Sequence, residues 1–286
     1  MKALLICPSE QSAVRLLAEN LPLAAVPALG QSLLEYWLLH LAMSGTKEVT
    51  ILADDRPEHI KAIVGDGARW GLKLEVVQES RELTPAQALL KYQNSADASR
   101  NLIQTLDHFP GMELWPLFTS YGTWFAGLQA WMPQARTADR VGVREMAPGI
   151  WIGFHAHVSA GAQLHAPCWL GQHVIIGEGA VLGPGTIIEE GAFIERAAEI
   201  SQSYIGPYTF VGRYSEIKDS IAWGNTLLNL KTGSSAKVPD PFVLCALRRP
   251  RLPASSGWFT RLAEIYTRNK EEVQLLWKHL LMNKEG

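Results

Sequence analysis

The sequence of 286 residues has no apolar run approaching the roughly eighteen residues needed to cross a bilayer, so we expect no membrane span. The apolar run from Lys2 to Cys7 ends at Pro8, before it reaches the usual length of a signal-peptide core. The three cysteines, Cys7, Cys168 and Cys245, are far apart and odd in number, which argues against a disulfide framework or a zinc site. We therefore expect buried thiols and a cytoplasmic protein.

The chain also lacks a strong charge of either sign. It has 26 Lys and Arg against 28 Asp and Glu, a net charge of −2, and a pI near 6.5. Nucleic acids and anionic membranes bind strongly basic surfaces, so neither is an expected partner. The length allows two domains, each with a core of its own.

The second half of the chain has a repeat of six residues. Large aliphatic residues recur at Ile152, Val158, Leu164, Leu170, Ile176, Leu182, Ile188, Ile194 and Ile200. Glycine directly follows the aliphatic residue at positions 153, 171, 177 and 183. The pattern predicts short strands joined by tight turns and stacked about 4.8 Å apart, with the aliphatic side chains inside. The period breaks by one residue at Ile205 and then continues loosely to about Asn229.

This repeat resembles the left-handed parallel β-helix of bacterial hexapeptide proteins, in which three hexapeptides make one coil. The resemblance covers about residues 149–229. Acyltransferases, carbonic anhydrases and nucleotidyltransferases all carry such a β-helix, so the fold alone does not identify the reaction. The resemblance also implies a homo-oligomer, because hexapeptide proteins are commonly trimers or dimers.

The first half has the pattern of a parallel α/β sheet. Apolar runs at 2–7, 48–52 and 72–77 predict buried strands, and residues 32–43 and 57–64 between them predict helices. The order of the pieces resembles the sugar-1-phosphate nucleotidyltransferase family. The matching residues are the first strand, Arg15, Leu21 to Leu23, Val26 and Pro27, Leu33 to Glu35, Gly45 to Ile51 and Gly65 to Leu72. The resemblance implies a sugar nucleotide or a nucleoside triphosphate as ligand.

The departures from that family concern its catalytic site. In the family, a glycine-rich loop after the first strand lets backbone N–H groups approach the nucleotide phosphates. This chain has no glycine from Pro8 to Val14, and it places the carboxylate of Glu10 there. The family's phosphate-facing lysine is matched by Leu23. The candidate nucleotide contacts that remain are Ser9, Gln11, Ser12 and Arg15.

The family also places a metal-binding Asp after a central apolar strand, and Asp107 is the nearest match. Arg15 and Asp107 are therefore the catalytic candidates for nucleotidyl transfer, and Mg²⁺ is expected only if that transfer is retained. The segment from Asp107 to Met132 is rich in aromatic residues. We expect these to pack the sheet against the first coil; the alternative is a sugar-stacking or lipid-contacting pocket.

Histidines in the repeat are the candidates for acyl transfer, the chemistry of hexapeptide acyltransferases. His155 and His173 are 18 residues apart and occupy the same turn position in successive coils, so they should stack. They are open to three interpretations: surface residues, a general base, or an anion or metal site. The charged residues Glu178, Glu189, Glu190, Glu195, Arg196 and Glu199 are expected to form a solvated face.

The combined prediction has four parts. Residues 1–148 form a shortened nucleotidyltransferase-like α/β domain, 149–230 a left-handed β-helix, 231–254 a linker and 255–286 a C-terminal helix. That helix has an apolar stripe that packs on its own β-helix or on other subunits. We expect a degraded catalytic site, and thus sugar-nucleotide binding or regulation of a working paralogue. The alternatives are an active nucleotidyltransferase and a hexapeptide acyltransferase.

Overall fold

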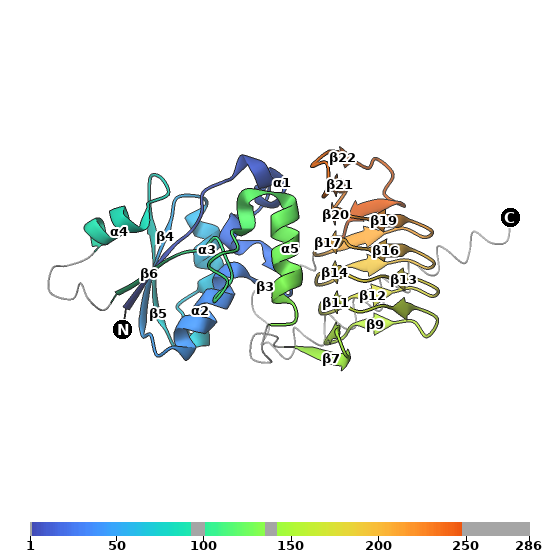
Figure 1. Cartoon of the computed structure of the whole chain (residues 1–286), viewed down its shortest axis with the longest axis horizontal. Helices are drawn as coiled ribbons and strands as arrows, with labels where there is room; N and C mark the ends of the chain where they lie inside the picture. The colour runs from blue at the N-terminus through green and yellow to red at the C-terminus, as the bar shows by residue number, and fades with distance from the viewer. Residues whose placement is uncertain (1, 93–100, 135–141, 248–286) are drawn as a thin grey trace, which may run out of the picture. The chain divides into compact units, whose positions relative to one another are not determined.

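The computed structural model describes residues 2–92, 101–134 and 142–247 (Figure 1). Up to Leu247 the chain belongs to one compact unit. The helix predicted for residues 255–286 lies outside the described residues. None of the helices described is long and apolar enough to cross a bilayer.

The N-terminal part is built on a parallel sheet of four strands in the order β5-β4-β1-β6. The strands are β1 (Lys2–Ile6), β4 (Glu48–Ala53), β5 (Lys73–Gln78) and β6 (Asn101–Thr105). The three predicted strands are confirmed. Buried side chains lie on both faces of β1, since Leu5 belongs to one core cluster and Leu4 to another. This explains why the strand is a continuous apolar run rather than an alternating one.

Helices connect these strands, and the two predicted ones are confirmed. The longer helices are α2 (Leu33–Met43), α3 (Pro57–Val64), α4 (Pro85–Tyr92) and α5 (Tyr121–Trp131), and α1 (Arg15–Ala18) is a single turn. Short 3₁₀ helices are η1 (Ser12–Val14), η2 (Leu23–Ala25), η3 (Ala68–Trp70) and η4 (Leu117–Thr119). Helix α2 begins with a capping box: Ser32 Oγ accepts the N–H of Glu35, and the Glu35 carboxylate accepts the N–H of Ser32.

A small hairpin precedes α2 and proves central to the fold. Its strands are β2 (Pro27–Ala28) and β3 (Gln31–Ser32), joined by Leu29 and Gly30. Both turn residues have positive φ, 56° and 83°. A two-residue turn of this kind is common in hairpins, but leucine at a positive φ is rare. Leu29 is buried, so the surrounding structure holds it in that conformation.

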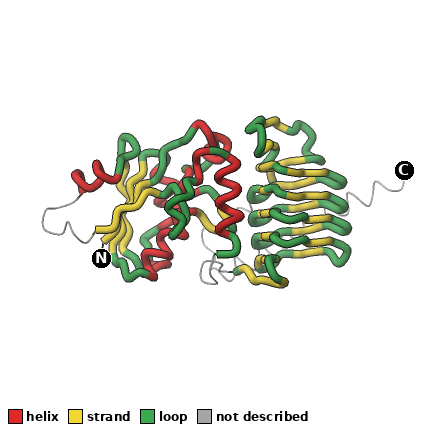
Figure 2. The backbone as a smooth tube through the Cα atoms, viewed as in Figure 1, coloured by secondary structure: helices red, strands yellow, loops and turns green. Residues whose placement is uncertain are grey.

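The second half of the chain forms a stack of three sheets (Figures 1 and 2). The first sheet contains β8 (Ile150–Gly153), β11 (Cys168–Leu170), β14 (Thr186–Ile188), β17 (Tyr204–Ile205) and β20 (Ser220–Trp223), with β7 (Val143–Ala147), β21 (Thr226–Asn229) and β22 (Ser235–Lys237) at its ends. The second sheet contains β9 (His157–Val158), β12 (Ile175–Ile176), β15 (Phe193–Ile194), β18 (Thr209–Val211) and β23 (Leu244–Ala246). The third contains β10 (Gln163–Leu164), β13 (Val181–Leu182), β16 (Glu199–Ser201) and β19 (Glu216–Lys218).

The chain passes through the three sheets in turn, so each layer of the stack contributes one strand to each sheet. Leu170 pairs with Ile152 on one side and Ile188 on the other, which gives a step of 18 residues. From Ile188 to Ile205 the step is one residue shorter, and parallel pairing continues up to β20. The predicted break in the period is therefore a shortened layer.

Two details at the end of the stack correct the sequence prediction. β21 runs antiparallel to β20, so it turns back instead of adding another parallel strand. Within the segment expected as a linker, β22 pairs with β21 and β23 pairs with β18. Gly233 and Ser234 lie in the turn between β21 and β22, and Pro239 and Pro241 lie in the connection from β22 to β23.

The repeating aliphatic residues form the interior of the stack, as predicted. Leu170, Leu182, Ile194 and Ile200 are almost completely buried in one core cluster. The outward side chains of the first sheet are also apolar, but they belong to the core of the N-terminal part. These residues are Trp151, Trp169, Ile187, Tyr204, Ile221 and Leu228.

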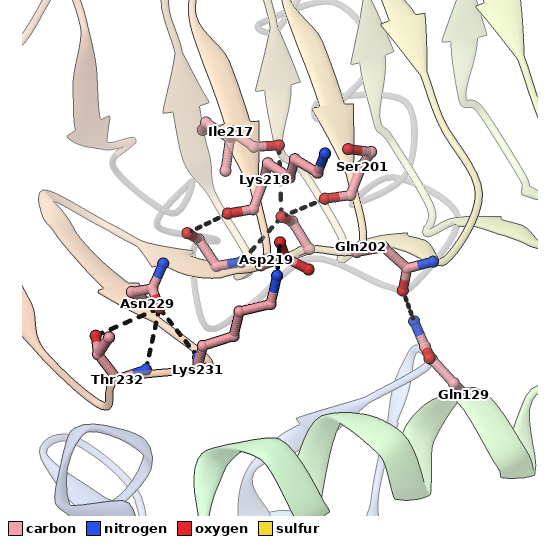
Figure 3. A network of polar contacts seen from close by, with 11 residues as sticks. Gln129, Ser201, Gln202, Ile217, Lys218, Asp219, Asn229, Lys231 and Thr232 are labelled. Atoms are coloured by element: carbon pink, nitrogen blue, oxygen red, sulfur yellow. Dashed lines mark hydrogen bonds and ion pairs between the residues drawn. The ribbon is translucent and has the colours of Figure 1, made fainter.

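Helix α5 supplies much of the contact between the two halves. Trp124 packs edge-to-face on Tyr204, with ring centroids 4.7 Å apart. The Gln129 side chain donates to Oε1 of Gln202 at 3.1 Å (Figure 3). It also donates to the carbonyl of Gly185 at 3.1 Å. The expectation that the aromatic segment packs against the repeat is therefore confirmed for Trp124, although its partner lies in a later layer than the first.

Candidate functional site

Four loops meet at the carboxyl edge of the N-terminal sheet, because its strands are parallel. Ser9 follows β1, Asp54 follows β4, Glu82 follows β5 and Asp107 follows β6. This edge is where α/β sheets bind ligands. It is also where the resemblance places the nucleotide phosphates.

Ser9 is held by two carboxylates. Its N–H donates to Oε2 of Glu82 at 2.9 Å, and its hydroxyl donates to Oδ2 of Asp54. The backbone N–H of Ser9, at the edge where the resemblance places the phosphates, is thus paired with a carboxylate. Burial, helped by the charges of Asp54 and Glu82, raises the pKa of the neighbouring Cys7 thiol far above its ordinary value. The site favours neutral or positive groups over phosphate.

The other candidate nucleotide contacts lie further along the chain. Ser12 begins η1 and Arg15 begins α1, and both side chains are exposed. Gln11 is partly buried, and its carbonyl accepts the N–H of Val14 at 3.1 Å. Among the described residues, no hydrogen bond joins any of these three to Ser9. The four candidates therefore share no hydrogen-bonded network among the described residues.

The structure places a cation, Arg56, at this edge, and the sequence analysis did not identify it. Arg56 has a positive φ of 43° and donates to both carboxylate oxygens of Asp55 at 2.8 Å. It also donates to the carbonyls of Ala18 and Leu21. The hydrogen bond with Asp55 raises the pKa of the guanidinium. The Arg56 guanidinium therefore binds Asp55 and the carbonyls at the end of α1. Nothing in the sequence around Arg56 indicated these contacts.

Leu23 occupies the place of the family's lysine, and the structure makes its role clear. It lies in η2 and is completely buried in the core of the N-terminal part. This position therefore offers no positive charge to a ligand. In this structure residue 23 is therefore a core residue.

Asp107 was the candidate metal ligand, and its surroundings do not fit Mg²⁺. Its Oδ1 lies 2.6 Å from Nδ1 of the buried His108, whose other ring nitrogen lies 3.0 Å from Nε2 of Gln104. Mg²⁺ prefers several oxygen ligands in near-octahedral geometry. Among the residues described, no three His, Cys, Asp or Glu side chains are arranged to hold a metal ion.

The histidine pair of the stack has the predicted arrangement. The rings of His155 and His173 are stacked, with centroids 5.0 Å apart and an angle of 8° between planes. Both residues have positive φ, at equivalent turns of successive layers. Burial, together with the charge of His155, lowers the pKa of His173, while the charge of Glu190 opposes this. Oε1 of Glu190 also accepts the hydroxyl of Tyr208 at 2.8 Å.

Glu189 corrects the prediction of a solvated acidic face. Its carboxylate is 1% exposed and accepts the N–H of Leu29 at 2.6 Å and of Gly30 at 2.9 Å. Burial raises the pKa of Glu189 to about 7, although the two backbone bonds act in the opposite direction. Position 189 follows an aliphatic residue where earlier layers have Gly153 and Gly171. A glutamate in place of glycine at this position was the sign in the sequence that Glu189 differs from the other acidic residues.

Comparison with known proteins bears on the N-terminal part. Residues 14–123 match the sequence model of the nucleotidyl transferase family. The N-terminal part of the chain is nucleotidyltransferase-like. It is similar to the glucose-1-phosphate thymidylyltransferase of Streptomyces griseus, with 31% identity over 90 residues. That match covers 32% of this chain and 25% of that enzyme, so the chain spans about a quarter of the length of this relative.

Two solved structures are similar to larger parts of the chain. One is the acetyltransferase domain of PglB from Neisseria gonorrhoeae FA1090, with 13% identity, a TM-score of 0.17, and coverage of 78% of this chain and 85% of that chain. The other is a mutant perosamine N-acetyltransferase from Caulobacter crescentus with CoA and GDP-perosamine, with 14% identity, a TM-score of 0.22, and coverage of 62% and 93%. Similarities with such low TM-scores support no conclusion about the fold or the function of this chain.

Proposed function

We propose that this chain is a nucleotidyltransferase-like protein that has lost nucleotidyl transfer, and that it acts by binding a sugar nucleotide or by regulating a working paralogue. The observation that carries the proposal is the pairing of Ser9 with Glu82 and Asp54. Nucleotidyl transfer concentrates negative charge on phosphate oxygens in the transition state, and preorganised donors must stabilise it. Here carboxylates occupy those donors.

The burial of Leu23 supports the same proposal, because no lysine is available for the phosphates. The environment of Asp107 adds to it, since His108 and not a set of oxygen ligands surrounds the carboxylate. Arg15 remains exposed, and a single exposed cation cannot replace the missing contacts. A sugar nucleotide would therefore have to bind through its base and sugar rather than through a phosphate loop.

A transfer assay tests this proposal. The full chain is incubated with glucose 1-phosphate, each nucleoside triphosphate and Mg²⁺, and pyrophosphate release is followed beside an active nucleotidyltransferase. Glucose 1-phosphate is chosen because the Streptomyces griseus relative carries it in its name. We expect no release above the protein-free rate. Turnover that disappears in Arg15→Ala would contradict the proposal and favour the active alternative.

We also propose the predicted boundary between an α/β domain of residues 1–148 and a stack that begins at residue 149, and a left-handed β-helix for that stack. The 18-residue register and the three sheets support the β-helix. Acyl transfer is the second candidate function. One observation favours it: His155 and His173 stack at equivalent turns, and burial lowers the pKa of His173, which favours the neutral imidazole that a general base requires. Acetyl transfer from acetyl-coenzyme A that is lost in both His155→Ala and His173→Ala would support it.

A further inference from the structure

A cavity of about 500 Å³ lies between the second half of α2, the loop that follows β6 and the end of α5. Pockets that bind small molecules usually measure about 300–1,000 Å³, so this cavity has the size of a ligand site. None of the carboxyl-edge residues Ser9, Asp54, Glu82 and Asp107 lines it. The cavity is therefore not part of the candidate phosphate site.

The buried part of the lining is an aromatic wall. Tyr36 comes from α2 and Trp131 from the end of α5, and both are buried. Phe109 stacks parallel on Trp131, with centroids 4.9 Å apart, and the Tyr36 ring packs edge-to-face against both at 5.6 Å. Pro110 adds a further buried apolar surface. Because the rings hold one another in place, the wall is formed before any ligand enters.

The indole N–H of Trp131 is an unpaired donor in this wall. Its Nε1 is buried and has no hydrogen-bond partner among the described residues, whereas the Tyr36 hydroxyl donates to the carbonyl of Leu29 at 3.1 Å. Nearly all buried polar groups in proteins are hydrogen-bonded, and the few polar groups of a ligand pocket orient the ligand. An unpaired donor in the wall of a cavity therefore fits a ligand that brings an oxygen acceptor.

The exposed part of the lining, its rim, is polar. His40 and Ser44 lie at the end of α2, and Gln134 follows α5. The Ser44 hydroxyl donates to the carbonyl of His40 at 2.9 Å, so the Ser44 oxygen can still accept a hydrogen bond. The Gln134 amide both donates and accepts. The rim thus suits a ligand with hydroxyl groups, which also do both.

The charge around the cavity disfavours a phosphate. The lining contains no Lys, Arg, Asp or Glu among the described residues. The last carbonyls of a helix carry a partial negative charge, and α2 ends at the rim with Met43. This charge repels an anion and attracts the hydrogen of a hydroxyl group. A neutral ligand is therefore favoured over a charged one.

We propose that this cavity binds a neutral sugar ring. The apolar C–H face of the ring lies against the aromatic wall, a sugar oxygen accepts the indole N–H of Trp131, and the remaining hydroxyls pair with the rim. A flat aromatic ligand would leave the polar rim unpaired. The aromatic segment from Asp107 to Met132 then has two roles, since Trp124 packs on the stack and Trp131 lines the sugar site. The site is independent of whether nucleotidyl transfer is retained.

Saturation-transfer difference NMR of the full chain tests the ligand class. The probes are the methyl glycosides of glucose, galactose, mannose and N-acetylglucosamine, with glucose 1-phosphate and indole for comparison. A single sugar ring makes few contacts, so we expect a dissociation constant on the order of 1 mM for at least one glycoside. Transfer should be strongest to its ring C–H protons. Signals from indole or glucose 1-phosphate alone, or from none of the probes, would overturn the proposal.

Variants of the lining test the place of binding. His40→Ala and Gln134→Ala change exposed residues and should each weaken the glycoside by about threefold or more. Trp131→Phe keeps an aromatic ring but removes the N–H, and should weaken it similarly. The matched control is His59→Ala, which removes an exposed imidazole from α3 that does not line the cavity, and binding should not change. Circular dichroism establishes that each variant is folded. Glycoside binding that is unchanged in both His40→Ala and Gln134→Ala would refute the assignment to this cavity.

Discussion

The carboxylate of Glu189 accepts the backbone N–H of Gly30 at 2.9 Å, although 159 residues separate the two in sequence. The same carboxylate accepts the N–H of Leu29, and the hydroxyl of Tyr204 donates to the carbonyl of Pro27 at 3.1 Å. Tyr36 completes the set by donating to the carbonyl of Leu29. One hairpin is therefore held from both halves of the molecule, and Glu189 and Tyr204 join the stack to the N-terminal part.

Removing the Glu189 side chain should destabilise the whole unit. Glu189→Ala leaves two buried N–H groups without their acceptor, so we expect the free energy of unfolding to fall by about 2–4 kcal/mol. Urea denaturation followed by tryptophan fluorescence measures this. Glu199→Ala, on the exposed third sheet, is the matched control and should change the value by less than about 0.5 kcal/mol. Equal effects in the two variants would show that the contact to the hairpin contributes nothing.

The raised pKa of Glu189 also predicts a pH dependence of stability. The native carboxyl keeps its proton up to about pH 7, whereas the unfolded one loses it near its ordinary value of 4.5. Between these values the native state binds more protons, so stability falls as pH rises, by about 3 kcal/mol in all. Glu189→Gln should lack this component. Denaturation curves from pH 4 to 8 compare the two proteins, and parallel pH profiles would refute the prediction.

Substitutions of the two charged neighbours of His173 should shift its pKa in opposite directions. Glu190→Gln removes a carboxylate that raises the pKa of His173, so that pKa should fall further. His155→Ala removes a neighbouring positive charge, so the pKa of His173 should rise. NMR titration of the His173 ring follows both variants. A shift of the same sign in the two would show that charge is not the cause.

Much of the fold follows from local pattern. The aliphatic residues six apart fix the interior of the stack, and the apolar runs fix β1, β4 and β5. The hexapeptide period does not reveal what lies outside each strand. Trp169, Phe193 and Glu199 are all outward residues, yet one is covered, one is half-buried and one is exposed. Only the tertiary arrangement distinguishes these environments.

The sequence predicts even less of the candidate site than of the fold. The sequence revealed the missing glycines and Leu23, because both are departures within one motif. It could not reveal that Glu82 accepts a hydrogen bond from Ser9, 73 residues away in sequence, or that Arg56 donates to Asp55. Those contacts arise because parallel strands bring distant loops to one edge. The buried Glu189 was missed for a similar reason, since its partners lie in the hairpin.

The loss of the phosphate site is the central claim, and a thermal-shift measurement tests it most directly. The full chain is heated with each nucleoside triphosphate, with sugar nucleotides and with acyl-coenzyme A, in the presence and absence of Mg²⁺. A ligand that binds only the folded state raises the melting temperature. We expect no Mg²⁺-dependent shift with any triphosphate, and we expect a shift with a sugar nucleotide. A clear Mg²⁺-dependent shift with one triphosphate would contradict it.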